Sequence, residues 1–148
     1  MQLTRYTDYS LRTLIFLAAR PDELTTVGDI ATVFSISHNH LMKVVHHLVQ
    51  AGYVTSRRGK NGGLNLARAA KDITVAEVVR AMEPSLNIVE CFAESHTECI
   101  LEGGCRLRSV LADARSAFLV ELKKVTIDDL LTQGAQKQLF AVSAIPTL

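Results

Sequence analysis

The chain has 148 residues, 48% of them hydrophobic, which suits one domain or a small domain with an appendage. No apolar run approaches the ~20 residues of a membrane span, and the first residues lack the apolar stretch of a signal peptide, so we expect a cytoplasmic protein. The net charge of +1 hides a basic first half, with nine Lys or Arg against four Asp or Glu in residues 1–71, and an acidic second half, with seven against eleven in residues 72–148.

Three short helices are predicted in the first fifty residues. The first covers residues 7–20, with Thr7 as its N-cap. Thr26 begins the second helix and Ser37 the third, and Gly52 suits the end of the third. Apolar residues recur at helical spacing in all three: Leu11, Leu14, Ile15 and Ala18; Val27, Ile30, Ala31 and Phe34; Leu41, Val44, Val45 and Leu48.

A β-hairpin and a short helix follow. Residues 53–57 are rich in β-forming side chains, residues 64–67 begin with an apolar and polar alternation, and a glycine-rich turn joins the two segments. Thr74 and Glu77 have the spacing of a capping box, which predicts the start of a short helix. Pro84 is expected to end that helix.

A long helix is predicted in the last third of the chain. It starts at Arg106, after residues 85–105, which lack clear periodicity. Its apolar residues recur three or four apart: Leu107, Leu111, Ala114, Phe118, Leu122 and Val125. This stripe favours packing against a partner helix over packing on the helix's own domain, with charged residues such as Arg115 toward solvent. We expect residues 133–148 to form a loose tail, because they show no strong pattern.

Three helices followed by a hairpin form the element order of a winged helix-turn-helix, in which the third helix enters the major groove of DNA and the hairpin, the wing, lies along the backbone. The third helix offers polar groups for bases and phosphates: Ser37, His38, Asn39, His40 and Lys43, with His46 and His47. The wing offers polar and cationic groups for phosphates: Arg57, Arg58, Lys60 and Asn61. Together they favour DNA binding. The alternative is a small α/β domain whose polar helix face is only solvated. A zinc site is disfavoured, because His46 and His47 point in different directions on a helix.

The three cysteines of the chain, Cys91, Cys99 and Cys105, lie within 15 residues. An odd number of thiols in a reducing compartment disfavours structural disulfides. Thiolates suit iron–sulfur clusters, zinc or copper(I), and the C-x₂₋₄-C pairs usual in structural zinc sites are absent. The alternative is three unrelated cysteines, one or two of them buried.

Clusters usually take four ligands, so three cysteines leave one position for another group. His96 is a candidate on chemistry alone. The acidic residues of the segment are more consistent with a solvated loop: Glu90, Glu94, Glu98 and Glu102.

In combination, these features resemble the winged-helix repressors of the NsrR type, which sense nitric oxide through a bound cluster. The resemblance extends over residues 1–131. It rests on residues 3–12, on Arg58–Gly63 in the wing, and on the three cysteines followed by Arg106.

The resemblance implies a homodimer packed through the long helix and bound to double-stranded operator DNA. It also implies a cluster, with 4Fe–4S favoured over 2Fe–2S, whose fourth ligand is an acidic residue in the partner's first helix. The matching residue here is Asp8, whose alternative role is a favourable interaction with the helix dipole. Cluster-assembly regulators of the same superfamily have a histidine where this chain has Arg108, which disfavours that branch. Iron-responsive relatives share the cysteine spacing, and Asp8 favours the nitric-oxide branch.

The sequence therefore predicts a mostly α-helical protein with a small β-hairpin. We expect a DNA-binding domain in residues 1–83, a cluster-binding loop in 84–105, a dimerisation helix with a short turn in 106–132, and the tail in 133–148. The predicted function is repression of transcription under the control of an iron–sulfur cluster that reacts with nitric oxide. The alternatives are an iron- or redox-responsive regulator of the same superfamily and a metal-free thiol-switch repressor. An enzyme is disfavoured, because the sequence shows no nucleotide-binding glycine loop and no plausible catalytic triad.

Overall fold

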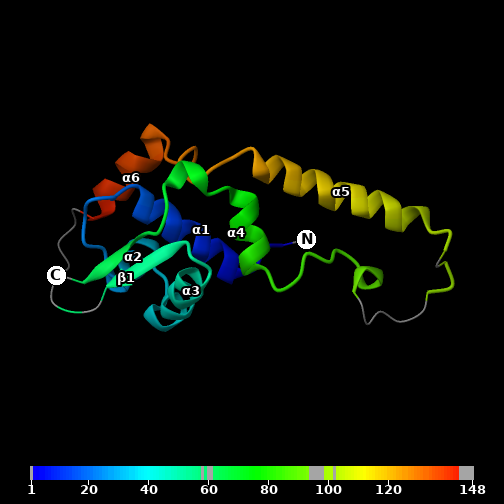
Figure 1. Cartoon of the computed structure of the whole chain (residues 1–148), viewed down its shortest axis with the longest axis horizontal. Helices are drawn as coiled ribbons and strands as arrows, with labels where there is room; N and C mark the ends of the chain where they lie inside the picture. Colours follow the sequence, from blue (N-terminus) through cyan, green and yellow to red (C-terminus); the bar gives the residue numbers. More distant parts are fainter. Residues whose placement is uncertain (1, 58, 60–61, 94–98, 102, 144–148) are drawn as a thin grey trace.

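The computed structural model describes residues 2–57, 59, 62–93, 99–101 and 103–143. Figure 1 shows a head of helices and a hairpin, from which one long helix projects. The predicted fold class is confirmed, since the described elements are mostly helical with one antiparallel two-stranded sheet. The helices are α1 (Arg5–Ala18), α2 (Val27–Phe34), α3 (His38–Gln50), α4 (Val75–Met82), α5 (Arg106–Lys123) and α6 (Gln133–Ser143), and the strands are β1 (Val54–Arg57) and β2 (Gly63–Leu66).

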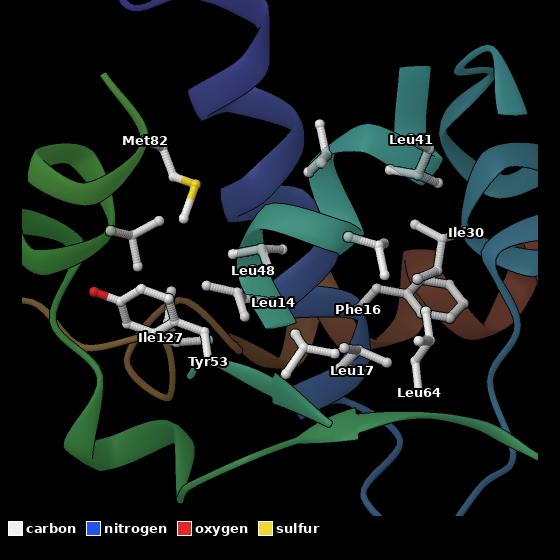
Figure 2. Packing of buried hydrophobic residues seen from close by; sticks show 14 of the residues in the cluster. Leu14, Phe16, Leu17, Ile30, Leu41, Leu48, Tyr53, Leu64, Met82 and Ile127 are labelled. Carbon is white, nitrogen blue, oxygen red and sulfur yellow. The ribbon is translucent and has the colours of Figure 1, made fainter. Parts of the chain in front are cut away.

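The core of the head lies between α1, α2, α3 and the hairpin. In Figure 2, Leu14, Phe16 and Leu17 of α1 lie among side chains from the other elements, such as Ile30 and Leu48. Complete burial of such a side chain stabilises the fold by roughly 1.5–3 kcal/mol. The apolar face predicted for α3 is buried: Leu41, Val44, Val45 and Leu48. Because α3 contributes this face to the core, its other side is turned outward.

The start of α1 differs from the prediction. Thr4, and not Thr7, is the N-cap, and its hydroxyl accepts a hydrogen bond from the Thr7 N–H at 3.3 Å. Thr7 itself is buried within the helix. The reason is a tertiary contact, because Glu83 Oε1 accepts hydrogen bonds from the Thr4 N–H at 2.7 Å and from the Thr4 hydroxyl at 3.0 Å. The helix consequently covers residues 5–18, two residues earlier than predicted.

The turn between α2 and α3 is short, as a helix-turn-helix requires. Thr26 caps α2 as predicted and forms a capping box with Asp29. Ser35 has a φ of 52°, in the left-handed region, and lets the chain reverse after α2. Ser37 occupies the N-cap of α3 as predicted, but its hydroxyl makes no capping hydrogen bond. Gly52 has a φ of +76° just after α3, which confirms its predicted role at the helix end.

The chain after α5 returns to the head and pairs with the start of α4. The Val75 N–H donates to the Val125 carbonyl at 2.9 Å, and the Ile127 N–H donates to the Ile73 carbonyl at 2.9 Å. The Ile127 side chain is fully buried. One end of α5 is therefore attached to the head, whereas its N-terminal end projects away from it (Figure 1).

The start of α4 is as predicted. The capping box of Thr74 and Glu77 is present, and the hydrogen bonds from Thr74 to the Glu77 carboxylate lower the pKa of Glu77. In the part of the chain that the structure describes, no helix has both the length and the apolar character needed to cross a bilayer.

The predicted loose tail is wrong for residues 133–143, which form α6, and residues 144–148 lie outside the described part. This helix packs on the head through Leu139, which is 8% exposed. The Leu139 carbonyl accepts a hydrogen bond at 2.9 Å from Arg20 at the end of the α1 region. The sequence pattern of α6 is weak because few of its side chains insert into the core.

Candidate nucleic-acid interface and cysteine segment

The polar side of α3 is presented to solvent. Most of the residues predicted to contact DNA are exposed: Ser37, His38, Asn39, His40, Lys43 and also His46. His47 is half-buried. These side chains supply hydrogen-bond donors, acceptors and one fixed positive charge on a single helix, as docking into a major groove requires.

Tyr6 of α1 braces α3 from the side. Its hydroxyl donates a hydrogen bond to the Lys43 carbonyl at 2.9 Å, and its ring centroid lies 5.7 Å from that of His47. Burial raises the pKa of Tyr6, so its hydroxyl stays protonated and able to donate. Residue spacing does not predict this role of Tyr6, because the contact joins residues 37 positions apart.

The wing lies beside the residues that lead into α2. Gly63 permits this approach, since a Cβ there would lie 3.2 Å from the Thr25 carbonyl oxygen. The Leu64 N–H donates to that oxygen at 2.8 Å. Arg57 at the end of β1 is exposed. Three other residues predicted to contact DNA lie outside the described part of the chain: Arg58, Lys60 and Asn61.

The described parts of the cysteine-containing segment, residues 85–93, 99–101 and 103–105, lie beyond the head, on the side of the N-terminal end of α5 (Figure 1). Cys91 belongs to the short 3₁₀ turn Glu90–Phe92, and Cys105 is the N-cap of α5. Both are half-buried, and Cys99 is exposed. Among the described residues of this single chain, no three His, Cys, Asp or Glu side chains gather closely enough to hold a metal ion. The candidate ligand His96 lies outside those residues, as do three of the acidic residues expected to keep the loop solvated: Glu94, Glu98 and Glu102.

An open hollow of about 700 Å³ lies next to Cys105. Its lining includes Phe92, which adjoins Cys91 in sequence, and three arginines: Arg106, Arg108 and Arg115. Two of the three cysteines thus occur at or next to a cationic hollow. A thiolate-ligated iron–sulfur centre is an anionic group for which such surroundings are favourable, so the residues present fit a cluster.

Arg115 of α5 connects this helix to the cysteine-containing segment. Its guanidinium lies 4.7 Å from the Phe92 ring centroid, and its Nη1 donates a hydrogen bond to Asn87 Oδ1 at 3.4 Å. The expectation that Arg115 faces solvent is therefore wrong, because the half-buried side chain packs on the turn that contains Cys91.

Asp8, the predicted fourth ligand, forms a two-point ion pair with Arg12 of its own chain. Arg12 Nη2 lies 2.8 Å from Asp8 Oδ2, and Arg12 Nε donates to Asp8 Oδ1 at 3.1 Å. Both side chains are 44% exposed. Exposed pairs contribute typically ~0–1 kcal/mol, so Asp8 can exchange Arg12 for another cationic partner at little cost.

The fold and these surfaces define a winged-helix DNA-binding protein. The chain belongs to the Rrf2 family, described as iron-dependent transcriptional regulators, whose pattern matches residues 3–133. It is therefore a DNA-binding regulator of transcription and not an enzyme.

Several relatives are named HTH-type transcriptional regulator NsrR. The one from Bacillus subtilis (strain 168) is 51% identical over 132 residues, covering 88% of this chain and 90% of the relative. The one from Halalkalibacterium halodurans is 45% identical over 139 residues, covering 93% and 95%. Their names agree with the resemblance stated from the sequence.

Solved structures show the same fold. CymR of B. subtilis, described as the global cysteine regulator, matches with a TM-score of 0.73 and 26% identity over 88% of this chain and 95% of that chain. IscR of T. potens matches with a TM-score of 0.73 over 93% and 91%, and at 24% identity it supports the fold alone.

Proposed function

We propose that this chain is a homodimeric repressor that binds operator DNA under the control of an iron–sulfur cluster and of nitric oxide. Cys91, Cys99 and Cys105 would hold the cluster, of the 4Fe–4S type, together with the partner subunit's Asp8. The observation that carries the proposal is the position of Cys105 beside the cationic hollow, in a chain 51% identical to a relative named NsrR. When bound, the cluster would supply iron centres that react with nitric oxide.

The exposed apolar surface of α5 supports a homodimer. None of the residues of α5 is buried, and three large apolar side chains on it are half or more exposed: Leu107 (64%), Val110 (50%) and Val120 (55%). Although part of α5 is half-buried against its own chain, these three apolar side chains are left largely uncovered. A second copy of the helix would cover this surface.

Two contacts would connect the cysteine segment with the DNA-reading head. Asp8 lies two residues after Tyr6 in α1, and Tyr6 is hydrogen-bonded to α3. A bond between Asp8 and the partner's cluster would therefore act on the same helix that positions α3. Glu83, at the end of α4, is hydrogen-bonded to Thr4 at the start of the same α1. The segment that leads to Cys91 thus begins at a residue attached to the N-terminus of α1.

For DNA, we propose that α3 enters the major groove and that Arg57 and its neighbours in the wing follow the backbone. Asn39 and Lys43 would read base edges, whereas wing cations would neutralise phosphates and make affinity fall steeply with salt. A homodimer would bind two half-sites separated by about one helical turn, ~10 bp, or a multiple of it.

The test uses the full chain isolated without oxygen. We expect a brown protein with the visible absorption of thiolate-bound iron, and an operator affinity that falls on addition of nitric oxide. Cys91→Ser should remove the colour, and Asp8→Ala should alter the spectrum and weaken the response of DNA binding to nitric oxide. Asp22→Ala, at an exposed acidic residue outside α1, is the matched control and should change neither.

Two results would contradict the proposal. A colourless anaerobic protein with three free thiols would instead support a thiol switch without metal. An Asp8→Ala variant with the original spectrum and nitric-oxide response would show that Asp8 is neither a ligand nor a coupling residue.

A further inference from the structure

One apolar side chain interrupts the polar side of α3. Met42 is 49% exposed, while the buried positions of the same helix, such as Leu41 and Val45, are 6% exposed or less. On the helix surface, Met42 lies one turn from both Asn39 and His46, which are exposed polar residues. The core of the head therefore does not use the Met42 side chain, although α3 is packed tightly on its opposite side.

The position of Met42 along the helix matters for DNA. Recognition helices contact base edges mainly with their N-terminal residues, and Met42 is the fifth residue of α3. The other exposed apolar residue of the helix, Val49 (37%), lies two turns nearer the C-terminal end. The bond from Tyr6 to the Lys43 carbonyl holds the backbone next to Met42, so its side chain is presented from a fixed point.

The chemistry of the major groove identifies what an apolar side chain can recognise there. Among the four bases, thymine alone carries an apolar group on its major-groove edge, the C5-methyl group, and the other groups at these edges are hydrogen-bond donors or acceptors. A methionine side chain is long, unbranched and polarisable, and it adapts to small apolar partners. It makes no hydrogen bonds that would favour another base.

We infer that Met42 is a specificity-determining residue that selects a thymine in each half-site by packing on its C5-methyl group. The inference rests on the proposed docking of α3 in the major groove and adds a base preference to it. Asn39 and Lys43 would read hydrogen-bonding groups on neighbouring bases, so α3 would combine polar and apolar recognition.

The experiment replaces thymine by deoxyuridine, which removes the methyl group and leaves the base-pairing hydrogen bonds unchanged. The probe is a duplex selected by the full-length protein from a pool of random sequences, with each thymine of one half-site replaced in turn. One replacement should weaken binding of the unaltered protein about fourfold, which corresponds to ~0.8 kcal/mol for one buried methyl group. At that position, the Met42→Ala variant should bind the thymine duplex and the deoxyuridine duplex with equal affinity.

Two variants make the result specific to Met42. Met42→Leu keeps an apolar side chain and should retain most of the preference for thymine. Val49→Ala removes exposed apolar surface from the same helix and should leave the thymine-to-deoxyuridine ratio unchanged. Because Met42 is half exposed, its substitution should not alter folding.

The inference is overturned if no thymine replacement affects binding, or if Met42→Ala still distinguishes the two duplexes at every position. Asn39→Ala and Lys43→Ala separate this failure from failure of the docking. If they change which bases are preferred, α3 still reads DNA and only the role of Met42 is wrong. If neither changes base preference, the docking itself is wrong, and the inference is overturned with it.

Discussion

Arg20 shows how a charged residue can stabilise the interior of this small protein. The residue is 5% exposed, and its guanidinium lies 4.0 Å from the Phe16 ring centroid and 4.7 Å from that of Phe140. It donates to the Leu139 carbonyl and pairs with Glu23 at 3.3 Å. A planar guanidinium can stack on rings and donate hydrogen bonds in its own plane, which a lysine cannot do. Arg20 thereby attaches α6 to the head.

We predict that Arg20→Ala lowers the free energy of unfolding by about 2 kcal/mol, because a buried hydrogen bond from a charged group is lost together with the ring contacts. Urea denaturation of the full chain measures the change, and hydrogen exchange should show faster opening of Gln133–Ser143. Arg80→Ala, at an exposed arginine of α4, is the control and should have an effect within about 0.5 kcal/mol. Unchanged exchange in α6 would contradict the role given to Arg20.

At the scale of elements, the contact between the start of α1 and the end of α4 connects two parts of the molecule that are remote in sequence. Thr4 and Glu83 are 79 positions apart, and both hydrogen bonds between them are 3.0 Å or shorter. The Thr4 hydroxyl also caps α1. Through this contact, the residue from which the chain leads to Cys91 is attached to the helix that contains Asp8 and Tyr6.

We predict that Glu83→Ala and Thr4→Ala each lower the free energy of unfolding by about 1 kcal/mol, since each removes the same interaction. The double variant should lose less free energy of unfolding than the two single variants lose together, because the effects of two residues that share an interaction are not additive. Both variants should also reduce the change in operator affinity caused by nitric oxide. Chemical denaturation and operator titrations measure these effects, and full additivity would argue against the contact.

The molecule as a whole is a compact head with one projecting arm. The arm, α5, is attached at its C-terminal end by the pairing of Val125 and Ile127 with the start of α4, and its far end adjoins the cysteine segment (Figure 1). This shape leaves the apolar side of α5 without cover in a single chain. It also places Cys91 and Cys105 outside the head, near the far end of α5.

We predict that Val110→Glu, which puts a charge on that apolar side, converts the dimer to a monomer and weakens operator binding at least about tenfold, because the two half-sites are no longer bound together. Sedimentation and operator titration measure the two effects. Gln136→Glu, at an exposed residue of α6 on the head, adds the same charge away from α5 and should leave the dimer intact. A Val110→Glu protein that stays dimeric would show that α5 is not the dimer contact.

Residue types and their spacing are enough to predict the elements whose causes are local. Helical periodicity predicted α1 to α5, the spacing of Thr74 and Glu77 predicted a capping box, and β-forming residues around glycines predicted the hairpin. The sequence also identified the polar side of α3 and the cysteine segment, because these depend only on residue types and spacing. For the same reason it supported the family resemblance.

Other features depend on contacts between residues that are distant in sequence. The choice of Thr4 over Thr7 as N-cap, the brace from Tyr6 to α3 and the anchoring of α6 by Arg20 join residues 79, 37 and 119 positions apart. Local propensity carries no signal for such contacts, since packing of the complete head brings the partners together.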